Sequence, residues 1–307
     1  MNEVEIIRHR QMEGLTLFVN TVEHRTPHSP PEWELLWLLD GGRTGSCGPQ
    51  TVSLVPGQMI LFAPSEIHEF QKTAVSGTFL CLQLSPQLFP SLPVLVLQQR
   101  CPHQVLEESR MEALRRSLAA AAQSYFAAAP RYELFCLGQC SLVLHTLLTA
   151  LESRALTREE AAAADRRNAR LERILRYVDE NYMHKPSLAQ LAQQEDCSLS
   201  YLSHFIRRTT NMSFQELVAA VRFNSASRLI IDTDMRLLDI CVAAGFSDYR
   251  YFSRAFRRQY GLTPEEYRHS GKADCRDTAV RRSLHSVERI YSPQESSALL
   301  QRFGPVL

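Results

Sequence analysis

The feature that most constrains this chain is a pattern that occurs twice in its C-terminal third. Residues 187–218 and 237–268 each read as a short apolar helix, a tight turn, a longer helix with cations near its end, and then an asparagine or a glycine. The apolar residues of each longer helix recur at helical spacing, which predicts one buried stripe per helix. The stripes are Leu202, Phe205 and Ile206 in the first copy and Phe252, Ala255 and Phe256 in the second. Two helices joined by such a turn form a helix-turn-helix motif.

The turns and helix starts of both copies carry suitable residues. Asp196 and Gly245 stand where the chain must bend sharply, and both tolerate a left-handed backbone. Ser198 and Ser247 are placed to cap the two longer helices. Between the copies, residues 213–231 form a helical pattern of 19 residues, which is about 28 Å at the rise of an α-helix. A rigid rod of that length can separate two reading heads by about one turn of DNA, roughly 34 Å.

The polar outer faces of the longer helices are the candidate DNA-binding surface, because a helix-turn-helix motif lays its second helix in the major groove. These residues are Ser200, Ser203, His204 and Arg207 in the first copy and Tyr249, Arg250, Ser253, Arg254 and Arg257 in the second. The first face has no cation before Arg207, so we expect Arg250 and Arg254 to dominate base readout. An arginine that contacts guanine with two hydrogen bonds contributes about 1–3 kcal/mol of discrimination. Contact with phosphate alone is the alternative for either arginine.

Residues 171–269 resemble the DNA-binding domain of the AraC/XylS family of bacterial transcription regulators. The residues that carry the resemblance are Leu188, Leu191-Ala192, Ser198, Tyr201-Leu202-Ser203, Ser213-Phe214, Arg222, Arg228, Ile240, Ala243, Gly245-Phe246-Ser247-Asp248, Tyr251-Phe252-Ser253-Arg254, Phe256, Gly261-Leu262-Thr263-Pro264 and Tyr267-Arg268. Ile206, Asn211, Arg236 and Cys241 depart from the family pattern in ways that packing and capping tolerate. The resemblance implies a transcription regulator, expected to be an activator, that has double-stranded DNA and RNA polymerase as partners and no catalytic residue.

The N-terminal hundred residues alternate like short strands broken by turn signals, which favours a sandwich or barrel. Gly41-Gly42 reads as a hairpin turn, and Pro56-Gly57 separates two further strands. HRTPHSPPEWELLWLLDGG and PGQMILFAPSEIH are similar to parts of the cupin-like sensor barrel found in many such regulators. That resemblance implies a small-molecule effector, for example a sugar. The candidate lining residues are His28, Trp33, Trp37, Arg43 and His68, with both tryptophans in the core as the alternative.

Cupin enzymes bind a metal through two close histidines, a glutamate and a later histidine. The candidates here are His24, His28, Glu34 and His68, but the usual His-x-His pair is missing. We therefore expect neither a metal nor another cofactor, and a two-histidine, one-glutamate site stays open as an alternative. Two rival functions follow: a metal-dependent cupin enzyme with an accessory helical domain, and a regulator without an effector that is controlled by protein contact or abundance.

Charge and cysteine usage bound the remaining choices. The net charge is +1, but residues 170–272 hold 15 Lys and Arg against 12 Asp and Glu, a net of +3. Residues 1–169 hold 14 against 17, a net of −3. This asymmetry is compatible with nucleic-acid binding by the C-terminal half. The eight cysteines lie scattered without a zinc-type spacing, and no apolar N-terminal segment precedes the first strand, so we expect free thiols and a cytoplasmic, membrane-free protein.

These observations predict an α+β multidomain protein with a cupin-like β-barrel and an all-α domain with two helix-turn-helix motifs. The expected divisions are a barrel over 1–100, a helical pair over 101–156, a linker over 157–170, a DNA-binding domain over 171–270 and a tail of unassigned role over 271–307. The helical pair carries more apolar surface than the barrel needs, so we expect it to form a homodimer interface.

Overall fold

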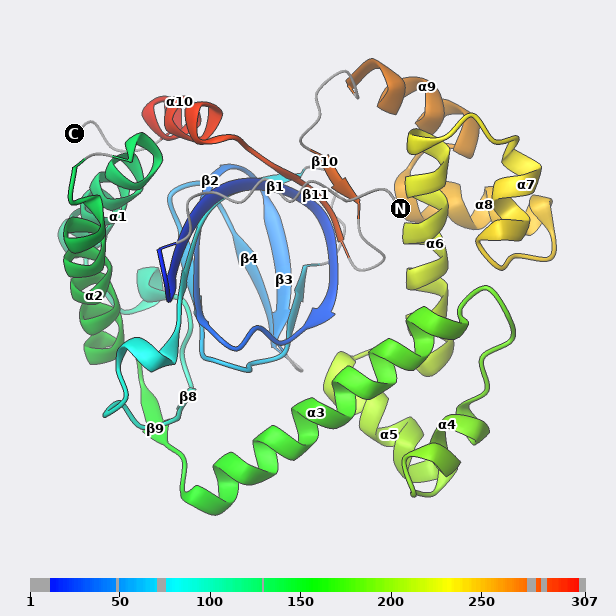
Figure 1. Ribbon diagram of the computed structural model, residues 1–307, viewed down its shortest axis with the longest axis horizontal. Helices are drawn as coiled ribbons and strands as arrows, with labels where there is room; N and C mark the ends of the chain where they lie inside the picture. The colour runs from blue at the N-terminus through cyan, green and yellow to red at the C-terminus, as the bar shows by residue number, and fades with distance from the viewer. Residues whose placement is uncertain are drawn as a thin grey trace.

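The structure is a computed structural model that describes residues 12–47, 50–70, 76–128, 130–274, 280–282 and 286–303. A curled β-sheet with helices on its outer face lies beside an all-helical part (Figure 1). The chain is therefore an α+β protein with an N-terminal barrel-like domain and a C-terminal helical domain, as the sequence predicts.

The N-terminal sheet is antiparallel and is centred on one long strand. Its strands are β1 (Leu15–His28), β2 (Trp33–Gly41), β3 (Arg43–Cys47), β4 (Gln50–Leu54), β5 (Met59–Phe62), β6 (His68–Phe70), β7 (Gly77–Leu84), β10 (Val280–Arg282) and β11 (Ser286–Ile290). The order is β4-β3-β6-β1-β7-β2-β5, and β11 pairs with both β1 and β10. A separate small ladder joins β8 (Leu95–Leu97) to β9 (Ser153–Ala155).

The hairpin expected at Gly41-Gly42 is wrong. Strand β2 pairs with β5 and β7, whereas β3 pairs with β4 and β6, so this turn carries the chain from one set of strands to another. Gly41 has a φ of +85°, and an added Cβ would lie 2.1 Å from the carbonyl oxygen of Ser76. Glycine is thus required because the backbone of Ser76 approaches closely. In the sequence, a glycine in this role cannot be told from a glycine in a hairpin turn.

The sheet buries both of its faces, and alternate residues of a strand point to opposite faces. On β2, Trp33, Leu35 and Trp37 belong to the core beneath the covering helices. Their neighbours Leu36 and Leu38 belong to the core inside the curled sheet. Because both faces are apolar, the strand reads as a nearly continuous hydrophobic run, and its sequence does not indicate which residues point inward.

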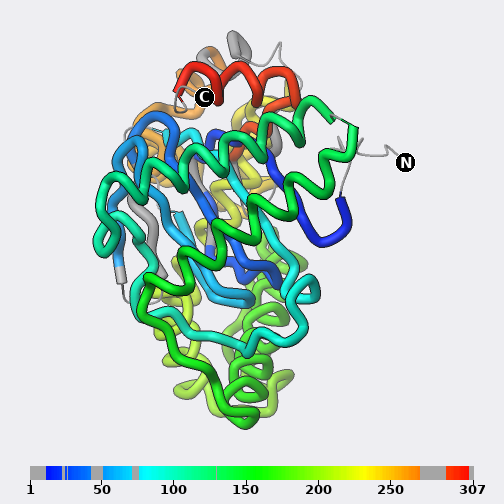
Figure 2. Tube along the Cα trace, turned by 90° about the vertical axis from the view of Figure 1, so that its left-hand side faces the viewer, coloured from blue at the N-terminus to red at the C-terminus, as the bar shows by residue number. Residues whose placement is uncertain are grey.

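Two long helices cover the outer face of the sheet, as Figure 2 shows from that side. They are α1 (Glu108–Ala127) and α2 (Tyr132–Ala150). Helix α2 is long and apolar enough to cross a membrane by length and composition, yet one of its faces packs into the protein core. Its outer face leaves Leu134, Phe135 and Leu142 exposed. The cysteines whose side chains the structure describes are free, and Cys136 and Cys140 lie buried on the inner face of α2.

A single helix, α3 (Arg158–Asn181), leads from the first part to the second (Figure 1). It begins with a capping box in which Thr157 and Glu160 bond each other's backbone. Residues 157–170, expected as a partly helical linker, therefore form the N-cap and first half of a continuous helix. Alanine-rich sequence behind a strong cap favours helix even without large apolar side chains.

The helical part contains two small cores joined by one central helix. Its helices are α4 (Leu188–Gln194), α5 (Leu199–Thr210), α6 (Phe214–Asp232), α7 (Leu237–Ala243), α8 (Tyr249–Tyr260) and α9 (Pro264–Asp274). One core lies among α3, α4, α5 and the first half of α6. The other lies among the second half of α6, α7 and α8. Both predicted helix-turn-helix motifs are thereby confirmed, with α6 as the 19-residue rod between them.

The segment after α9 returns to the N-terminal sheet. Residues Asn20 to Arg25 of β1 pair with Ile290 to Ser286 of β11, and the helix α10 (Pro293–Phe303) lies beside α1 (Figures 1 and 2). Leu300 is buried in the core under the covering helices. The tail over 271–307 had no assigned role from the sequence, and its described parts complete the sensor-side fold.

Candidate DNA-reading face and sensor site

Helices α5 and α8, the reading helices of the two motifs, each begin at a side-chain cap just after a sharp turn. Ser198 caps α5 by accepting a hydrogen bond from the Tyr201 amide at 3.1 Å, as predicted. On α8 the cap is Asp248, which accepts from the Tyr251 amide at 2.6 Å, so the assignment to Ser247 is wrong by one residue. Aspartate and serine cap about equally well, so the sequence Ser-Asp left two adjacent choices.

The turns before these helices have the predicted left-handed geometry. Asp196 has a φ of +49° and Gly245 a φ of +84°. The helices also end at left-handed residues, Asn211 and Gly261. These positions fix where each reading helix starts and stops, and so fix which side chains lie on its outer face.

Apart from Tyr249, which packs partly against the second core, the predicted DNA-binding residues lie away from the two cores. Leu202, Ile206, Phe252 and Phe256 are fully buried, which leaves the opposite face of each helix to solvent. The exposed members of the predicted set are Ser200, Ser203, His204, Arg207, Arg250, Arg254 and Arg257, and the half-buried members are Tyr249 and Ser253. The structure therefore gathers the set on one outward face per motif.

The chemistry of the two outward faces differs. On α5, Arg207 forms an ion pair with Glu216 at 3.0 Å, and His204 Nδ1 contacts the Ser200 carbonyl oxygen at 2.9 Å. On α8, Arg250 and Arg254 form no hydrogen bond or ion pair with any residue that the structure describes. The second face thus presents uncommitted guanidinium groups, the donors best suited to guanine edges or phosphates.

A tight corner fixes one motif against the other. Arg222 on α6 donates to the carbonyl oxygens of Tyr182 at 2.7 Å and His184 at 2.5 Å, and its guanidinium lies over the Phe246 ring. Gly245 faces the same point, since an added Cβ would lie 2.6 Å from the Tyr182 carbonyl oxygen. The turn of the second motif therefore rests on the C-terminal end of α3, which packs into the core of the first motif.

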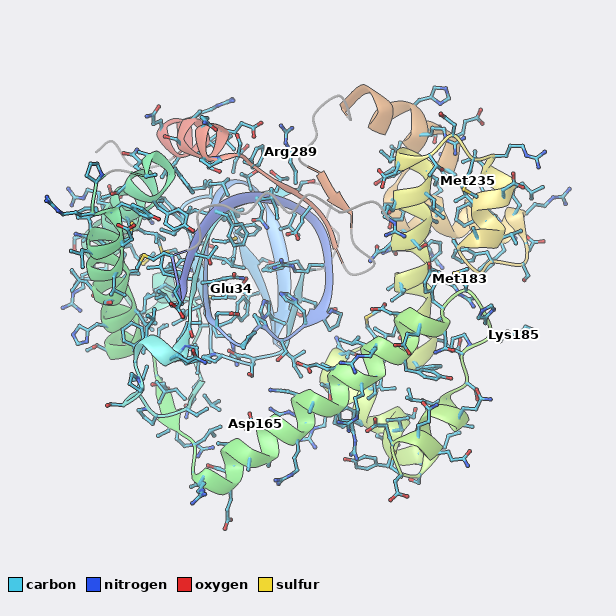
Figure 3. The ribbon with its side chains drawn as sticks, viewed as in Figure 1. Glu34, Asp165, Met183, Lys185, Met235 and Arg289 are labelled. Carbon is cyan, nitrogen blue, oxygen red and sulfur yellow. The ribbon has the colours of Figure 1, made fainter. Side chains whose placement is uncertain are left out.

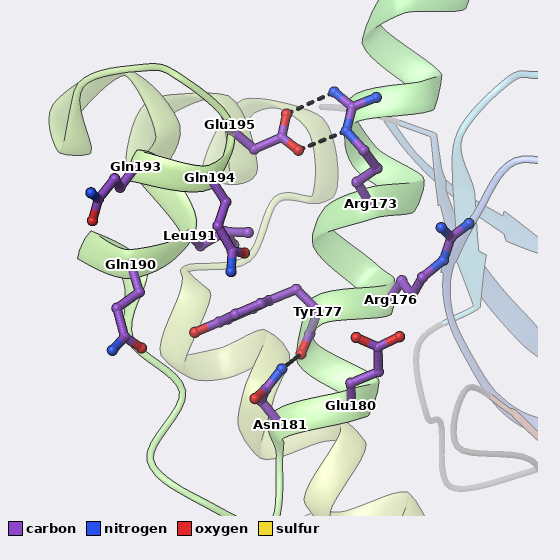
Figure 4. Close-up of a pocket in the computed structure, with 10 residues that line it drawn as sticks. All are labelled: Arg173, Arg176, Tyr177, Glu180, Asn181, Gln190, Leu191, Gln193, Gln194 and Glu195. Atoms are coloured by element: carbon purple, nitrogen blue, oxygen red, sulfur yellow. Dashed lines mark hydrogen bonds and ion pairs between the residues drawn. The ribbon is translucent and has the colours of Figure 1, made fainter.

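A polar groove of about 600 Å³ runs between α3 and α4 (Figure 4). At its edge, Glu195 accepts hydrogen bonds from Arg173 at 2.7 Å and from Arg170 at 3.1 Å. The hydrogen bond from Arg173 lowers the pKa of Glu195, although partial burial acts in the opposite direction. This cluster holds α4, and with it the first motif, against α3.

The interior of the curled sheet holds a polar cluster around Glu34, which Figure 3 shows within the ring of strands. Glu34 Oε2 lies 2.8 Å from His68 Nε2, Glu34 Oε1 accepts a hydrogen bond from Gln83 Nε2 at 3.0 Å, and Arg25 lies 3.7 Å away. Burial opposes ionisation of Glu34, but the hydrogen bond and charge of His68 and the charges of Arg25 and His28 outweigh it and hold the Glu34 pKa well below its usual range. Glu34 is 0% exposed and His68 is 1% exposed.

The cluster extends to the returning tail. Glu288 of β11 bonds Asn20 Nδ2 at 2.9 Å and pairs with Arg25 at 3.3 Å. Cys81 donates to the other atom of the same amide, Asn20 Oδ1, at 3.2 Å. Asn20 and Gln83 each interrupt an apolar strand at an inward position, and that interruption was the signal available in the sequence. Nothing in the sequence connects Glu288 to this site, because the partner strand is 268 residues away.

The structure brings together only part of the predicted effector set. His28 and His68 lie with ring centroids 4.2 Å apart. Trp33 and Trp37 are buried on the other face of the sheet, beneath α1 and α2, so a pocket shared with the two histidines is not formed. The core alternative holds for both tryptophans. Arg43 lies in β3, and its side chain is outside the described part of the structure.

Three residues of metal-binding types, two histidines and one glutamate, meet inside the curled sheet. One donor atom each from His28, Glu34 and His68 lie within 4.8 Å of one another. These are three of the four candidates considered from the sequence. The side chain of the fourth, His24, lies outside the described side chains. The missing His-x-His spacing therefore did not prevent a two-histidine, one-glutamate cluster, because β1 and β6 bring the second histidine from a distant part of the chain.

Comparisons with known proteins agree with both parts of this architecture. The family profile described as "AraC-like ligand binding domain" matches residues 17–135, and that described as "Helix-turn-helix domain" matches residues 191–270. The uncharacterised HTH-type transcriptional regulator YijO of Escherichia coli (strain K12) is 32% identical over 127 residues, which are 41% of this chain and 44% of the relative. The melibiose operon regulatory protein of the same organism is 27% identical over 95 residues, 31% of this chain and 32% of the relative.

The matched regions thus span less than half the length of these curated relatives. Among solved structures, ToxT of Vibrio cholerae O395 is 12% identical, with 84% of this chain and 98% of that chain covered at a TM-score of 0.42.

Proposed function

We propose that this chain, which belongs to the AraC family of transcription regulators, binds a specific DNA site through α5 and α8 in response to a small molecule held by its N-terminal domain. The family is one of regulators and not an enzyme class, and we propose no catalytic activity. Activation of transcription, through contact with RNA polymerase, is the expected output.

The observation that carries the proposal is the paired outward faces of α5 and α8. Both helices are capped and both bury the central residues of an apolar stripe, and the contacts at Arg222 and Gly245 hold them in one fixed relation. Two reading helices on one rigid frame can enter successive major-groove segments without dimerisation. We infer that Arg250 and Arg254 read bases, whereas the α5 face supplies weaker contacts.

Helix α2 supports a homodimer. Leu134, Phe135 and Leu142 are exposed on its outer face at 72%, 45% and 55%. Large apolar side chains exposed on one helix favour burial against a second copy. A cytoplasmic homodimer is therefore part of the proposal, and sedimentation of a Leu142→Glu variant would show loss of the dimer.

The effector signal has a short physical route to the DNA-binding helices. Asn168, a buried residue of α3, donates to the Ser65 carbonyl oxygen at 2.9 Å. The Ser65 amide in turn donates to the Pro30 carbonyl oxygen at 2.7 Å. Ser65 and Pro30 lie within three residues of His68 and His28. A ligand at these histidines would therefore move the surface on which α3 rests, and α3 forms part of the first DNA-binding core.

The effector class is proposed from the side chains near His68 and from the name of one relative together. The melibiose operon regulatory protein is named for a sugar operon, and His28 and His68 supply polar groups suited to a hydroxyl-rich ligand. A thermal-shift screen against sugars, sugar acids and small aromatics tests this, because a ligand that binds the folded state raises the melting midpoint. A regulator controlled by protein contact or abundance would show no shift across the panel.

DNA binding itself is tested by fluorescence anisotropy with labelled genomic fragments at several salt concentrations. We expect a preferred fragment whose affinity falls as salt rises, because phosphate contacts release counterions. Arg250→Ala and Arg254→Ala should weaken that fragment more than random DNA. Arg116→Ala, an exposed arginine on α1, removes the same charge far from the reading helices and should change neither affinity. Equal affinity for all fragments would overturn sequence-specific binding.

A further inference from the structure

The sensor core contains a donor set whose chemistry goes beyond hydrogen bonding to an organic effector. His28, Glu34 and His68 converge from three strands, β1, β2 and β6, on one buried point. Two imidazoles and one carboxylate are a donor combination that divalent first-row transition metals prefer. We propose that these three side chains bind such a cation, with Zn²⁺ as the reference ion.

The spacing of the three donors is close to what one ion requires. They lie within 4.8 Å of one another, and donors bound to a single ion at about 2.1 Å are separated by roughly 3–4 Å. Glu34 and His68 are already 2.8 Å apart. A small rotation of the His28 ring, which sits at the end of β1 and is only half-buried, completes the set.

The ring nitrogens of His68 have divided roles. Nδ1 lies 3.0 Å from the Glu66 carbonyl oxygen, which can only accept a hydrogen bond, so Nδ1 carries a hydrogen. Nε2 faces the Glu34 carboxylate at 2.8 Å, so this ring nitrogen is the one placed to bind a metal ion beside the carboxylate. A carbonyl that fixes Nδ1–H is the usual way in which a protein orients a metal-binding histidine.

The surroundings hold these groups in place. Gln83 donates to Glu34 Oε1 at 3.0 Å, which fixes the plane of the carboxylate. The Phe62 ring stacks on His68 with centroids 3.8 Å apart and an interplanar angle of 3°. Apolar side chains, among them Leu36, Ile60 and Phe79, pack in the same interior. An ion needs only the donors and displaces none of these side chains.

Metal binding is measured directly, without reference to DNA. Full-length protein is treated with a chelator, dialysed and titrated with Co²⁺, whose visible absorption reports coordination, and Zn²⁺ is then added in competition. We expect one ion per chain by elemental analysis, a cobalt spectrum of nitrogen and oxygen donors without a thiolate charge-transfer band, and displacement by Zn²⁺. Glu34→Gln keeps the shape of the side chain and should weaken binding at least about 100-fold, since even hydrogen-bond partners of ligands are worth about 10–100-fold.

Control variants keep the result decisive. His145→Ala removes an exposed histidine of α2 and should leave affinity and stoichiometry unchanged. Circular dichroism checks that Glu34→Gln folds, and His28→Ala, at the half-buried strand end, serves if it does not. The proposal is overturned if the wild-type protein shows no saturable site, or if both site variants bind Co²⁺ as tightly as wild type. A thiolate band would likewise overturn it, because it would place the ion at the cysteines.

A second readout rests on the proposed DNA binding. Zn²⁺ should change the affinity for the preferred fragment at least several-fold, and Asn168→Ala should abolish that change while metal affinity stays as in wild type. If the protein binds metal but no specific DNA, the proposed function fails and the metal site stands. If it binds DNA but no metal, only the metal site fails.

Discussion

The two helix-turn-helix motifs have the same backbone geometry and differ in the side chains on their outward faces. Both have a left-handed turn, a capped reading helix and a buried stripe, but the faces differ. Helix α5 offers serines, a histidine and an arginine paired with Glu216, whereas α8 offers Arg250 and Arg254, which pair with no residue that the structure describes. The turns also differ, because Asp196 has only to adopt its φ, whereas Gly245 must also leave room for the Tyr182 carbonyl. The duplication thus conserves geometry and not chemistry, which predicts unequal sensitivity to equivalent changes.

The largest difference is expected at the turns. Gly245→Ala should lower the free energy of unfolding by about 2–4 kcal/mol, since it adds left-handed strain to a contact that the backbone cannot relieve. Asp196→Ala adds strain alone and should cost about 1 kcal/mol. Urea unfolding of both variants measures the two effects. Similar losses of unfolding free energy in the two variants would show that the backbone near Tyr182 moves at little cost to accept the added Cβ.

The next difference concerns DNA affinity. Arg254→Ala should weaken binding to the preferred fragment by about 1–3 kcal/mol, roughly 5- to 150-fold, if the guanidinium contacts a guanine edge. Ser203→Ala on α5 removes only one hydroxyl and should change affinity less than about threefold. Anisotropy titrations at one fixed salt concentration compare them. A larger effect at Ser203 would reverse the assignment of the two faces.

A third test uses pH to isolate the contribution of Glu195 to the stability of the first motif. The pKa of Glu195 is lowered, chiefly by its hydrogen bond from Arg173, so its stabilisation is present above its ordinary pKa and is lost as pH falls through the lowered value. Glu195→Gln should therefore cost about 1–2 kcal/mol at pH 7 and progressively less below about pH 4. Unfolding of wild type and variant across this range checks the trend. A penalty that stayed constant with pH would mean that packing, and not charge, holds α4.

The smallest test concerns the caps. Ser198→Ala and Asp248→Ala should each cost about 1 kcal/mol, because each removes a bond to an orphan amide of its reading helix. Ser247→Ala should cost little, since Asp248 performs that role. Thermal midpoints of the three variants suffice. Loss of stability at Ser247 equal to that at Asp248 would contradict the observed cap.

The DNA-binding half was largely predictable because its information is local. Turn residues such as Asp196 and Gly245, and stripes such as that of Leu202 and Ile206, lie within a few residues of the structure that they determine. Only the choice between Ser247 and Asp248 failed, since either residue caps a helix. Short-range patterns of this kind need no knowledge of distant partners.

The sensor half was less predictable because its pairings are distant. The orientation of Trp33 and Trp37 could not be inferred from β2, whose two faces are equally apolar. The Gly41-Gly42 turn resembled a hairpin, but β2 and β3 choose other partners. His28 and His68 were named as candidates, yet their meeting at Glu34 depends on strand pairing that spacing alone does not give.

The return of β11 to β1 makes the sensor fold discontinuous in the gene. The DNA-binding helices are encoded within the sensor, and synthesis places them before the strand that carries Glu288, some 268 residues after its partner Asn20. During translation the reading helices therefore emerge while the barrel still lacks an edge strand and the carboxylate that pairs with Arg25. A hybrid regulator made by one junction at α3 would remove that strand together with the old DNA-binding domain, so exchange requires two junctions.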